Sequence, residues 1–430
     1  MREMKDSGVE WIGQIPKDWK IIKGKYVLEY LQKPVKDDDG VITCFRDGEV
    51  TLRSNRREDG FTLSDKEIGY QGIDVGDLVV HGMDGFAGAI GISDSRGKAS
   101  PVLNVFNSKY SKRYLMYYLR SMAFSNVFIA LASGIRVRSC DLSWNKLANL
   151  PYPTTSYEEQ TEIVRYIDSQ CSEIDATAED IQKEISLLED YKKSVITEAV
   201  TKGLNPDAEM KDSGIEWIGQ IPKHWKVVRL EFLSWVRARL GWKGLKADEY
   251  VDEGYPFLSA FNIQDSKIKW EPLNFITKER FDESPEIMVA CGDVLLLKDG
   301  AGVGKCARID SLPKGDSTVN SSLAVITCFD NLNYRYLYYS FNSSFFSNLI
   351  NLKLNGMGVP HLTQEELRKF IVLLPCVKEQ QQIADFLDTK CSEIDAIIAD
   401  KKRQRDILAE YKKSLIYECV TGKKEVPVHE

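Results

Sequence analysis

The sequence predicts a mixed α/β (α+β) protein: two globular lobes separated by two long antiparallel coiled-coil helices. Two observations lead to this prediction. Two kinds of segment each occur twice along the 430 residues, which indicates an internal pseudo-twofold repeat. One kind also has the apolar spacing of a coiled coil and contains neither proline nor glycine. The chain therefore reads as extended segment, lobe, long helix, and then the same three parts again.

Each copy opens with an extended segment that we call the strap, residues 4–20 and 210–226. The two straps are identical at 15 of 17 positions. Pro16 and Pro222 exclude a continuous helix, because proline lacks the amide hydrogen that a helix interior needs. We expect the straps to dock on a core through large apolar anchors, with a tryptophan cage for a ligand as the alternative. These anchors are Trp11, Trp19, Trp217 and Trp225.

The first lobe follows its strap and contains signals for both strands and helices. Short apolar runs at 41–45, 49–52 and 77–80 alternate with glycine and charged turns, which predicts strands. Residues 111–133 have the spacing of one amphipathic helix. A glycine-rich stretch at 82–91 predicts a hairpin tip.

The second lobe has the same plan with little shared sequence. A strand is predicted at 294–298 and a helix from 333 onward, and Thr363 with Glu366 forms a capping box for a further helix. The offset between equivalent landmarks grows from 206 at the straps to 220 at the long helices, so the second lobe holds 14 more residues. Near-identical frame segments around divergent lobes suggest two recognition modules.

The first long helix is predicted over 159–201, and its apolar residues repeat at alternating spacings of four and three, interrupted only by Lys192. The repeating positions are Ile167, Cys171, Ile174, Ala178, Ile181, Ile185, Leu188, Val195 and Ala199. Such a stripe needs a long partner, and the repeat of the helix within the chain is the expected one. Homodimerisation through the same stripes is the alternative.

The second long helix shares 16 of 31 aligned positions with the first, from Cys391 to Thr421. Its stripe is polar in the middle, at Lys401 and Arg405. The apolar positions on either side are Leu387, Cys391, Ile394, Ile398, Leu408 and Leu415.

These signals divide the chain into five predicted segments. The lobes with their straps are 1–155 and 204–375, the long helices are 156–203 and 376–422, and the tail is 423–430.

Composition predicts a globular, cytoplasmic protein with no membrane segment. Hydrophobic residues make up 43% of the chain, and no apolar run approaches the length of a membrane span. Nine cysteines without a CxxC pair and four scattered histidines predict neither a disulfide framework nor a metal site. The net charge is −7, yet residues 17–150 carry 20 Lys and Arg against 16 Asp and Glu, whereas residues 158–204 carry 5 against 12. The lobes therefore remain available to an anionic partner.

Motifs for catalysis are missing from the sequence. Residues 300–305 read GAGVGK and resemble a phosphate-binding loop. Such a loop would need glycine at position 299 and serine or threonine at position 306, where this chain has Asp299 and Cys306. Neither an Asn-Pro-Pro or Asp-Pro-Pro methyltransferase motif nor a Gly-x-Ser-x-Gly elbow is found. We therefore predict that the chain is not an enzyme and holds no cofactor of its own.

Basic residues mixed with amides and aromatics occur at turn-rich places in both lobes. Arginine and asparagine can pair with guanine and adenine edges, and lysine neutralises phosphate, so these residues are the candidates for DNA contact. Taken singly, each of them is more often an ordinary solvated surface charge than a DNA contact. The candidates are Arg53, Asn55, Arg56, Arg57, Arg136, Arg138, Arg237, Arg239, Trp242, Lys243, Lys246, Lys298 and Lys305.

The paired segments resemble the specificity (S) subunit of type I restriction-modification systems over essentially the full length. One part of the resemblance is the strap from Glu10 to Trp19, repeated from Glu216 to Trp225. The other part is the entry to each long helix, Leu150-Pro151 with Glu159-Gln160 and Ile163, repeated as Leu374-Pro375 with Glu379-Gln380 and Ile383. The first approach is longer, at Tyr152 to Thr155, which blurs that helix boundary.

The resemblance implies two target recognition domains that each read one half of a bipartite target in double-stranded DNA. It also implies long helices that set the spacing and dock two methylation (M) subunits, which use S-adenosylmethionine, and restriction (R) subunits, which use ATP. The family lends no catalytic residue to this chain. A non-catalytic coiled-coil scaffold whose lobes bind proteins is the competing function, and salt-dependent DNA binding would separate the two.

Overall fold

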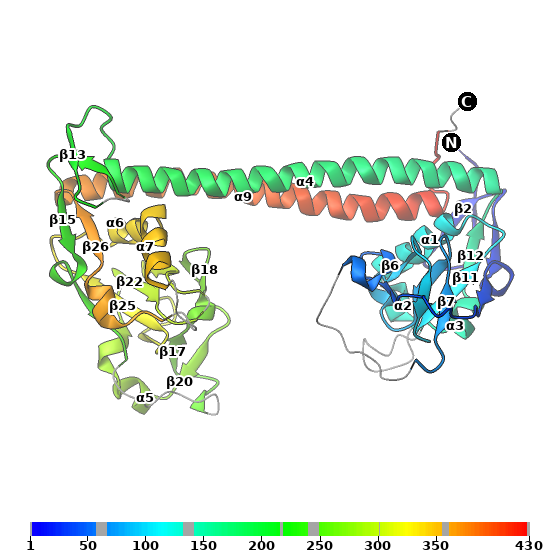
Figure 1. Ribbon diagram of the computed structural model, residues 1–430, viewed down its shortest axis with the longest axis horizontal. Helices are drawn as coiled ribbons and strands as arrows, with labels where there is room; N and C mark the ends of the chain where they lie inside the picture. Colours follow the sequence, from blue (N-terminus) through cyan, green and yellow to red (C-terminus); the bar gives the residue numbers. More distant parts are fainter. Residues whose placement is uncertain are drawn as a thin grey trace. The chain divides into compact units, whose positions relative to one another are not determined.

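The computed structural model describes residues 2–56, 67–131, 142–215, 218–239, 249–300, 302–354 and 361–427. The chain divides into two compact units, Met1–Gln182 with Arg403–Glu430, and Lys183–Lys402 (Figure 1). Each unit holds one lobe together with a part of each long helix. The predicted segments treated each long helix as a separate piece, whereas these units divide both helices between them.

The first unit contains a lobe of short strands and three short helices, followed by the start of a long helix. Its strands are β1 (Met4–Asp6), β2 (Gln14–Pro16), β3 (Lys20–Lys23), β4 (Glu29–Leu31), β5 (Ile42–Cys44), β6 (Val50–Leu52), β7 (Gln71–Ile73), β8 (Leu78–His81), β9 (Ile90–Ile92), β10 (Gly97–Ala99), β11 (Leu103–Asn107) and β12 (Pro151–Thr154). Its helices are α1 (Lys112–Phe124), α2 (Val127–Ala130), α3 (Trp144–Asn149) and the first part of α4 (Tyr157–Lys202).

The second unit has the larger lobe. Its strands are β13 (Met210–Asp212), β14 (Gln220–Pro222), β15 (Lys226–Arg229), β16 (Ser234–Arg237), β17 (Tyr255–Leu258), β18 (Ile263–Gln264), β19 (Lys267–Ile268), β20 (Asn274–Ile276), β21 (Met288–Val289), β22 (Asp293–Leu297), β23 (Cys306–Arg308), β24 (Ser317–Val319), β25 (Leu323–Cys328) and β26 (Ile371–Leu374). Its helices are α5 (Lys278–Asp282), α6 (Tyr334–Phe341), α7 (Ser344–Leu354), α8 (Gln364–Arg368) and the first part of α9 (Val377–Val420).

The two lobes share one frame. Each strap forms a hairpin, β1 with β2 and β13 with β14, and each lobe is closed by a two-stranded sheet, β3 with β12 and β15 with β26. The central antiparallel sheet has the order β4-β11-β8-β9 in the first lobe and β16-β25-β22-β23 in the second. The repeat predicted from sequence is therefore present in the topology as well.

The strand register makes individual positions of the two central sheets equivalent. Leu78 pairs with Phe106 on one side and Ile92 on the other. Val294 pairs in the same way with Ile326 and Arg308. Arg308 of the second lobe thus occupies the sheet position that Ile92 holds in the first.

The lobes differ in what surrounds the shared sheet. In the first lobe, β5 pairs with β6 and β7 with β10 as separate two-stranded sheets. The second lobe has instead a four-stranded sheet of order β20-β17-β24-β21 and a small hairpin of β18 and β19. Most of the structural divergence therefore lies outside the frame.

The predicted strands at 41–45, 49–52, 77–80 and 294–298 are confirmed as β5, β6, β8 and β22. The capping box of Thr363 and Glu366 is confirmed at the start of α8. The prediction of one helix over 111–133 was wrong. The helix ends at Phe124, and Asn126 adopts a left-handed conformation (φ 57°) before α2 begins. Apolar spacing continues through such a break, so periodicity alone does not reveal it.

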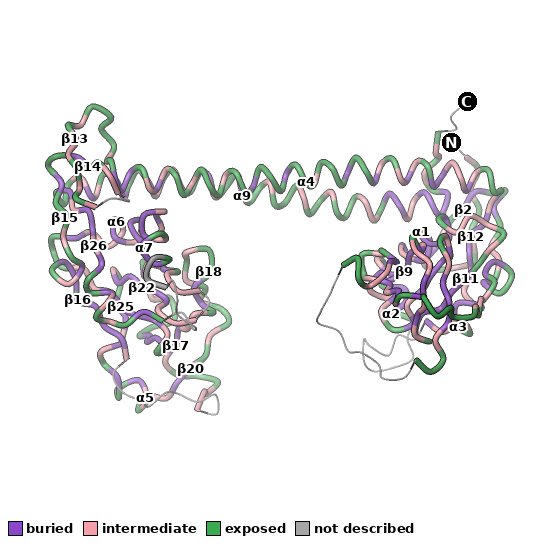
Figure 2. The backbone as a smooth tube through the Cα atoms, in the orientation of Figure 1, coloured by how far each residue is buried: buried purple, intermediate pink, exposed green. Residues whose placement is uncertain are grey.

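The long helices run antiparallel within each unit, as predicted. In the first unit, Lys412 of α9 lies 2.6 Å from Asp175 of α4. In the second, Lys192 of α4 lies 2.6 Å from Asp395 of α9, and Lys401 pairs with Glu184. The polar interruptions of the apolar stripe are therefore satisfied by ion pairs. Buried and exposed residues alternate along both helices (Figure 2).

Each lobe has a core that continues onto its long-helix segments. In the first unit, Trp19, Tyr114 and Ile167 belong to one buried cluster. In the second, Trp225, Tyr336 and Leu387 belong to the equivalent cluster. The straps are anchored through tryptophan as expected at Trp19 and Trp225, which are fully buried, while Trp217 lies outside the described residues. None of the described helices is long and apolar enough to cross a membrane.

Candidate nucleic-acid interface

Each lobe is fixed to the start of its long helix by a tryptophan and a glutamate. The indole Nε1 of Trp19 donates to Oε2 of Glu159 at 3.2 Å, and Nε1 of Trp225 donates to Oε1 of Glu379 at 3.0 Å. Both glutamates lie in the first turn of their helix, where the helix dipole favours negative charge. A strap and a long helix that are distant in sequence are thereby joined.

The next residue of each helix is a buried glutamine that fixes a lobe helix. Gln160 Oε1 accepts from the backbone N–H of Ser111 at 2.9 Å, just before α1. Gln380 Oε1 accepts from the N–H of Asn333 at 2.8 Å, just before α6. Both glutamines have no exposed surface. The orientation of α1 and α6 therefore follows from the long helices.

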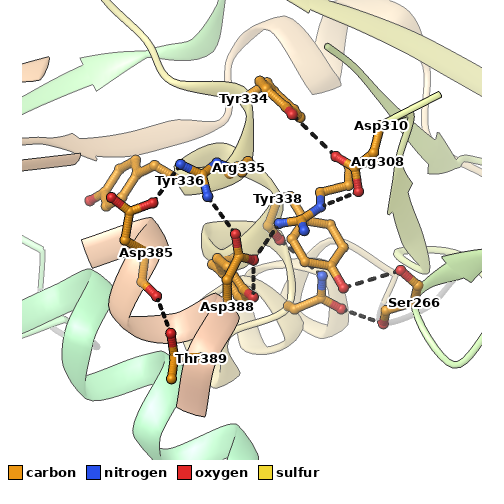
Figure 3. Close-up of polar contacts among 12 residues, drawn as sticks. Ser266, Arg308, Asp310, Tyr334, Arg335, Tyr336, Tyr338, Asp385, Asp388 and Thr389 are labelled. Carbon is orange, nitrogen blue, oxygen red and sulfur yellow. Dashed lines mark hydrogen bonds and ion pairs between the residues drawn. The ribbon is translucent and has the colours of Figure 1, made fainter. Parts of the chain in front are cut away.

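A second attachment lies two turns further along each long helix. Asp168 of α4 accepts hydrogen bonds from Arg113 and Tyr117 of α1. Asp388 of α9 accepts from Arg335 and Tyr339 of α6 and also from Arg308 of β23 (Figure 3). These two attachments hold each lobe to its long helix, so the rest of the lobe surface is fixed relative to that helix.

The first group of predicted DNA-contacting residues follows β6 on an exposed turn. Arg53 and Asn55 are tied to the adjacent hairpin, with Arg53 Nε 3.3 Å from Thr43 Oγ1 and Asn55 Nδ2 2.8 Å from Thr51 Oγ1. Arg57 lies outside the described residues, as do Arg136 and Arg138.

Arg56 is exposed, but its guanidinium is held by neighbouring groups. It lies 2.8 Å from Asp47 and 3.0 Å from Glu49, and 4.2 Å above the ring of Phe45. Partial burial opposes ionisation of Asp47, yet hydrogen bonds from the Glu49 N–H and from Arg56 hold the pKa of that carboxyl below its usual value. An approaching phosphate would have to compete with these two carboxylates for Arg56.

Arg237 is placed differently from the other candidates, because its guanidinium is buried inside the second lobe. It donates to the carbonyl of Met288 at 2.7 Å and to Asp293 at 2.9 Å, and it also bonds Thr327. These contacts give Arg237 a structural role. We therefore leave it out of the surface that we propose for DNA contact.

The remaining candidates of the second lobe lie at the ends of the central sheet. Arg239 follows β16 and is half-buried. Lys298 is half-buried and lies 2.7 Å from Asp299, which also contacts His361. Lys305 is exposed in the hairpin between β22 and β23, next to Gly304, whose φ of +92° favours glycine. Trp242, Lys243 and Lys246 lie outside the described residues.

The structure adds exposed aromatic residues that sequence reasoning missed. Trp235 of β16 is 53% exposed between two buried neighbours, and Phe261 is 62% exposed in the turn before β18. Ser234, Val236 and Arg237 are all buried, so β16 does not alternate strictly with period two, and the sequence Ser-Trp-Val-Arg did not single out Trp235 as the exposed residue. Exposed aromatic rings provide surfaces for stacking and for apolar contact with bases.

The described residues also include the kinds of group that could form a metal centre or a reactive thiol. No group of three or more His, Cys, Asp or Glu among them is arranged to hold a metal ion. Eight described cysteines are free thiols, and burial raises the pKa of Cys44 and Cys328 to about 12, so these two stay protonated.

Comparison with known proteins identifies related chains. The family model described as the type I restriction modification DNA specificity domain matches residues 222–404. The MjaX specificity subunit of Methanocaldococcus jannaschii, a putative type I restriction enzyme by its name, is 24% identical over 96% of each chain. The MjaVIII specificity subunit of the same organism is 26% identical over 65% of this chain and 63% of its own length, which is less than two-thirds.

Solved structures share the fold over nearly the whole length. A chain from a study of complex assembly and conformational transition of the type I R-M system superposes with a TM-score of 0.71, at 16% identity, over 95% of this chain and 99% of that one. The HsdS subunit from Thermoanaerobacter tengcongensis gives a TM-score of 0.52 at 17% identity, over 95% and 98% of the two chains. With the repeated straps, lobes and long helices, these matches show that the chain has the fold of the HsdS subunit and is similar to type I restriction enzyme specificity subunits, with residues 222–404 matching their DNA specificity domain.

Proposed function

We propose that this chain recognises DNA for a type I restriction-modification complex, with each lobe reading one half of a bipartite target. The observation that carries the proposal is the contrast between frame and lobe. Trp19 and Trp225, Gln160 and Gln380 make matching contacts in the two units. The sheets around the shared frame differ between the lobes. The two lobes are held to their long helices by the same contacts but present different surfaces, as expected of two domains that recognise different DNA sequences.

The surface that we assign to DNA contains the basic turn of the first lobe and the β22–β23 hairpin end of the second. Arg53 and Arg56 belong to the former, and Lys298 and Lys305 to the latter. Phosphate contacts by such residues would position each lobe, and base contacts would specify sequence. The net charge of −7 does not oppose this, because 12 acidic residues lie within 158–204.

We further propose that the long helices dock two methylation subunits through repeated apolar pairs. Leu187 and Tyr191 are 67% and 51% exposed on α4 in the second unit, and Ile407 and Tyr411 are 60% and 47% exposed on α9 in the first. Each pair has a spacing of four residues, and each member of one is 220 positions from its counterpart in the other. Two equivalent apolar patches favour two copies of one partner.

Methyl transfer and DNA cleavage are assigned to partner subunits in this proposal. The methylation subunits would bind S-adenosylmethionine, and the restriction subunits would use ATP. The support is the lack of catalytic motifs in the sequence together with relatives that are named specificity subunits of restriction enzymes.

A lobe exchange tests DNA recognition. The chain is expressed with its cognate methylation subunit, and methylated adenines are mapped by single-molecule sequencing. Replacing residues 21–150 with the first lobe of another family member is expected to change one half of the methylated sequence and preserve the other. Methylation by the purified chain alone, or a change in both halves together, would contradict the proposal. A protein-binding scaffold would give no methylation pattern at all and no salt-dependent DNA binding.

Native mass spectrometry tests the docking patches. Replacing Leu187 and Tyr191 by serine, or Ile407 and Tyr411 by serine, is expected to reduce the number of bound methylation subunits from two to one, because each pair loses its apolar contact. The exposed neighbour Asp190, replaced by serine, serves as the matched control. Two bound subunits in both double variants would show that the patches do not dock this partner.

A further inference from the structure

We infer that Asp168 and Asp388 are positioning residues that fix the angle between each lobe and its long helix, and so limit which half-site spacings the protein accepts. This inference rests on the proposed DNA recognition. It assigns to two carboxylates a role in specificity that is separate from base contact. The argument depends on where they lie, on their donors and on the difference between the two units.

The position of each aspartate makes it a second attachment point. Gln160 and Gln380 hold the lobe helices at the start of α4 and α9. Asp168 and Asp388 lie eight residues further along, which is about 12 Å at 1.5 Å per residue. One attachment point leaves a lobe free to rotate about it, whereas two points separated along the helix define an angle. Removing the second point should therefore loosen orientation while leaving the lobe attached.

Asp388 joins both layers of the second lobe to α9. Its Oδ1 accepts from Arg308 at 2.6 Å and from the hydroxyl of Tyr339 at 2.7 Å, and its Oδ2 accepts from Arg335 (Figure 3). Arg308 belongs to the edge strand β23, while Arg335 and Tyr339 belong to α6. The carboxylate thus fixes the sheet and the helix of the lobe together.

The surroundings of this contact shield it from solvent. The Arg308 and Asp388 side chains are 20% and 26% exposed, and Arg308 lies 5.1 Å from the ring centroid of Tyr338. Burial opposes ionisation of Asp388, yet hydrogen bonds from Tyr339, Arg308 and Arg335 keep its pKa below the ordinary value. Hydrogen bonds that involve a charged group are stronger than neutral ones, and this contact is partly shielded from water.

The first unit has a weaker version of the same contact. Asp168 accepts from Arg113 at 2.6 Å and from Tyr117, both on α1. Ile92 stands at the sheet position equivalent to Arg308, so no charged group of that strand position reaches Asp168. The Arg113 and Asp168 side chains are also more exposed, at 53% and 35%. Salt should therefore weaken this contact more than that of Asp388.

The test uses the full chain reconstituted with its methylation subunit. Once the target has been mapped, methylation rates are measured on duplexes with the native spacer and with one base pair added or removed. Discrimination is the ratio of the native rate to the altered one. Asp388→Asn is expected to lower discrimination at least about threefold, because charge-assisted hydrogen bonds are lost. The preferred bases within both half-sites should stay unchanged. A general loss of structure would instead reduce recognition of the half-sites themselves.

Arg308→Ile provides a second variant that copies the first lobe and keeps Arg335 and Tyr339 in place. Arg308→Ile should lower discrimination less than Asp388→Asn does. If circular dichroism shows that Asp388→Asn does not fold, the discrimination of Arg308→Ile tests the positioning role instead. Asp168→Asn should also lower discrimination. Added salt should lower discrimination further in Asp388→Asn, where the more exposed Asp168 contact remains, than in Asp168→Asn, where the Asp388 contact remains. Asp282→Asn, which breaks an exposed pair with Lys278 within α5, is the matched control.

The outcomes separate this inference from the proposed function. Unchanged spacer discrimination in folded Asp388→Asn and Arg308→Ile, with normal methylation of the native site, would overturn the positioning role and leave DNA recognition intact. Failure of the wild-type complex to methylate any bipartite site would instead overturn the proposed function. A change in the preferred bases of a half-site would show that the aspartates act in base reading rather than positioning.

Discussion

Trp19 donates its indole hydrogen to Glu159 across 140 residues of sequence, and its ring is completely buried. Trp225 repeats this contact with Glu379 at 3.0 Å. The glutamates do not act alone, because Glu159 also pairs with Arg2 and Glu379 lies 2.8 Å from His224. The strap and the start of a long helix therefore meet at one carboxylate in each unit.

Glu159→Ala is expected to destabilise the first unit by about 1–3 kcal/mol, because the buried indole N–H of Trp19 would lose its acceptor. Glu159→Gln should cost less, since the amide oxygen can still accept. Chemical denaturation followed by tryptophan fluorescence measures both. Glu158→Ala, an exposed change in the same helical turn, is the control. Equal stability of the Glu159→Ala and Glu158→Ala proteins would contradict the assigned role.

Ile185→Ala should cost about 2–5 kcal/mol of unfolding free energy in the second unit, because it leaves a cavity where a side chain is 1% exposed. Leu187→Ala, two residues away, should change stability by less than about 0.5 kcal/mol, since its side chain faces solvent in the free chain. Thermal unfolding of the two variants makes the comparison. Similar losses for both would mean that the helix presents a different face to its partner.

Arg237→Ala should destabilise the second lobe by about 3–5 kcal/mol, because it leaves Asp293, which is 1% exposed, as an uncompensated buried charge. Arg237→Lys should not restore stability, since an ammonium group cannot reproduce the planar set of donors. Urea denaturation measures these effects, with half-buried Arg239→Ala as the comparison. A stable Arg237→Ala protein with altered DNA specificity would place Arg237 back among the base-reading residues.

Acid should weaken the first lobe through Asp74. Hydrogen bonds from Lys33 and Arg96 lower the pKa of Asp74 from 3.8 to about 2. A depressed folded-state pKa means that the ionised carboxylate stabilises the fold above the unfolded value of 3.8, and that this contribution is lost as pH falls from there toward 2. The urea midpoint of the wild type should fall over this window more steeply than that of Asp74→Asn. Asp37→Asn, an exposed change in the same lobe, should keep the wild-type slope.

Local patterns account for the elements that the sequence predicted correctly. The spacing of Ile167, Ile174 and Ile181 predicted a long helix because one face of a helix repeats about every 3.6 residues. Thr363 and Glu366 predicted the start of α8 because a capping box involves only neighbours in sequence. The DNA-contacting candidates had no such local signature. They stay predictions, and Arg57, Arg136, Arg138, Trp242, Lys243 and Lys246 lie outside the described residues.

Sequence alone therefore determined the repeat, the mixed α/β class, the long antiparallel helices and the family resemblance, since each follows from periodicity or from identity between segments. Tertiary structure decided how the lobes are held. The contacts of Asp388 with Arg308, the burial of Arg237 against Asp293 and the pairing of Lys192 with Asp395 join residues 80, 56 and 203 positions apart. A charged side chain looks the same in sequence whether it faces solvent or a buried partner, and only the folded chain sets the distance that distinguishes the two.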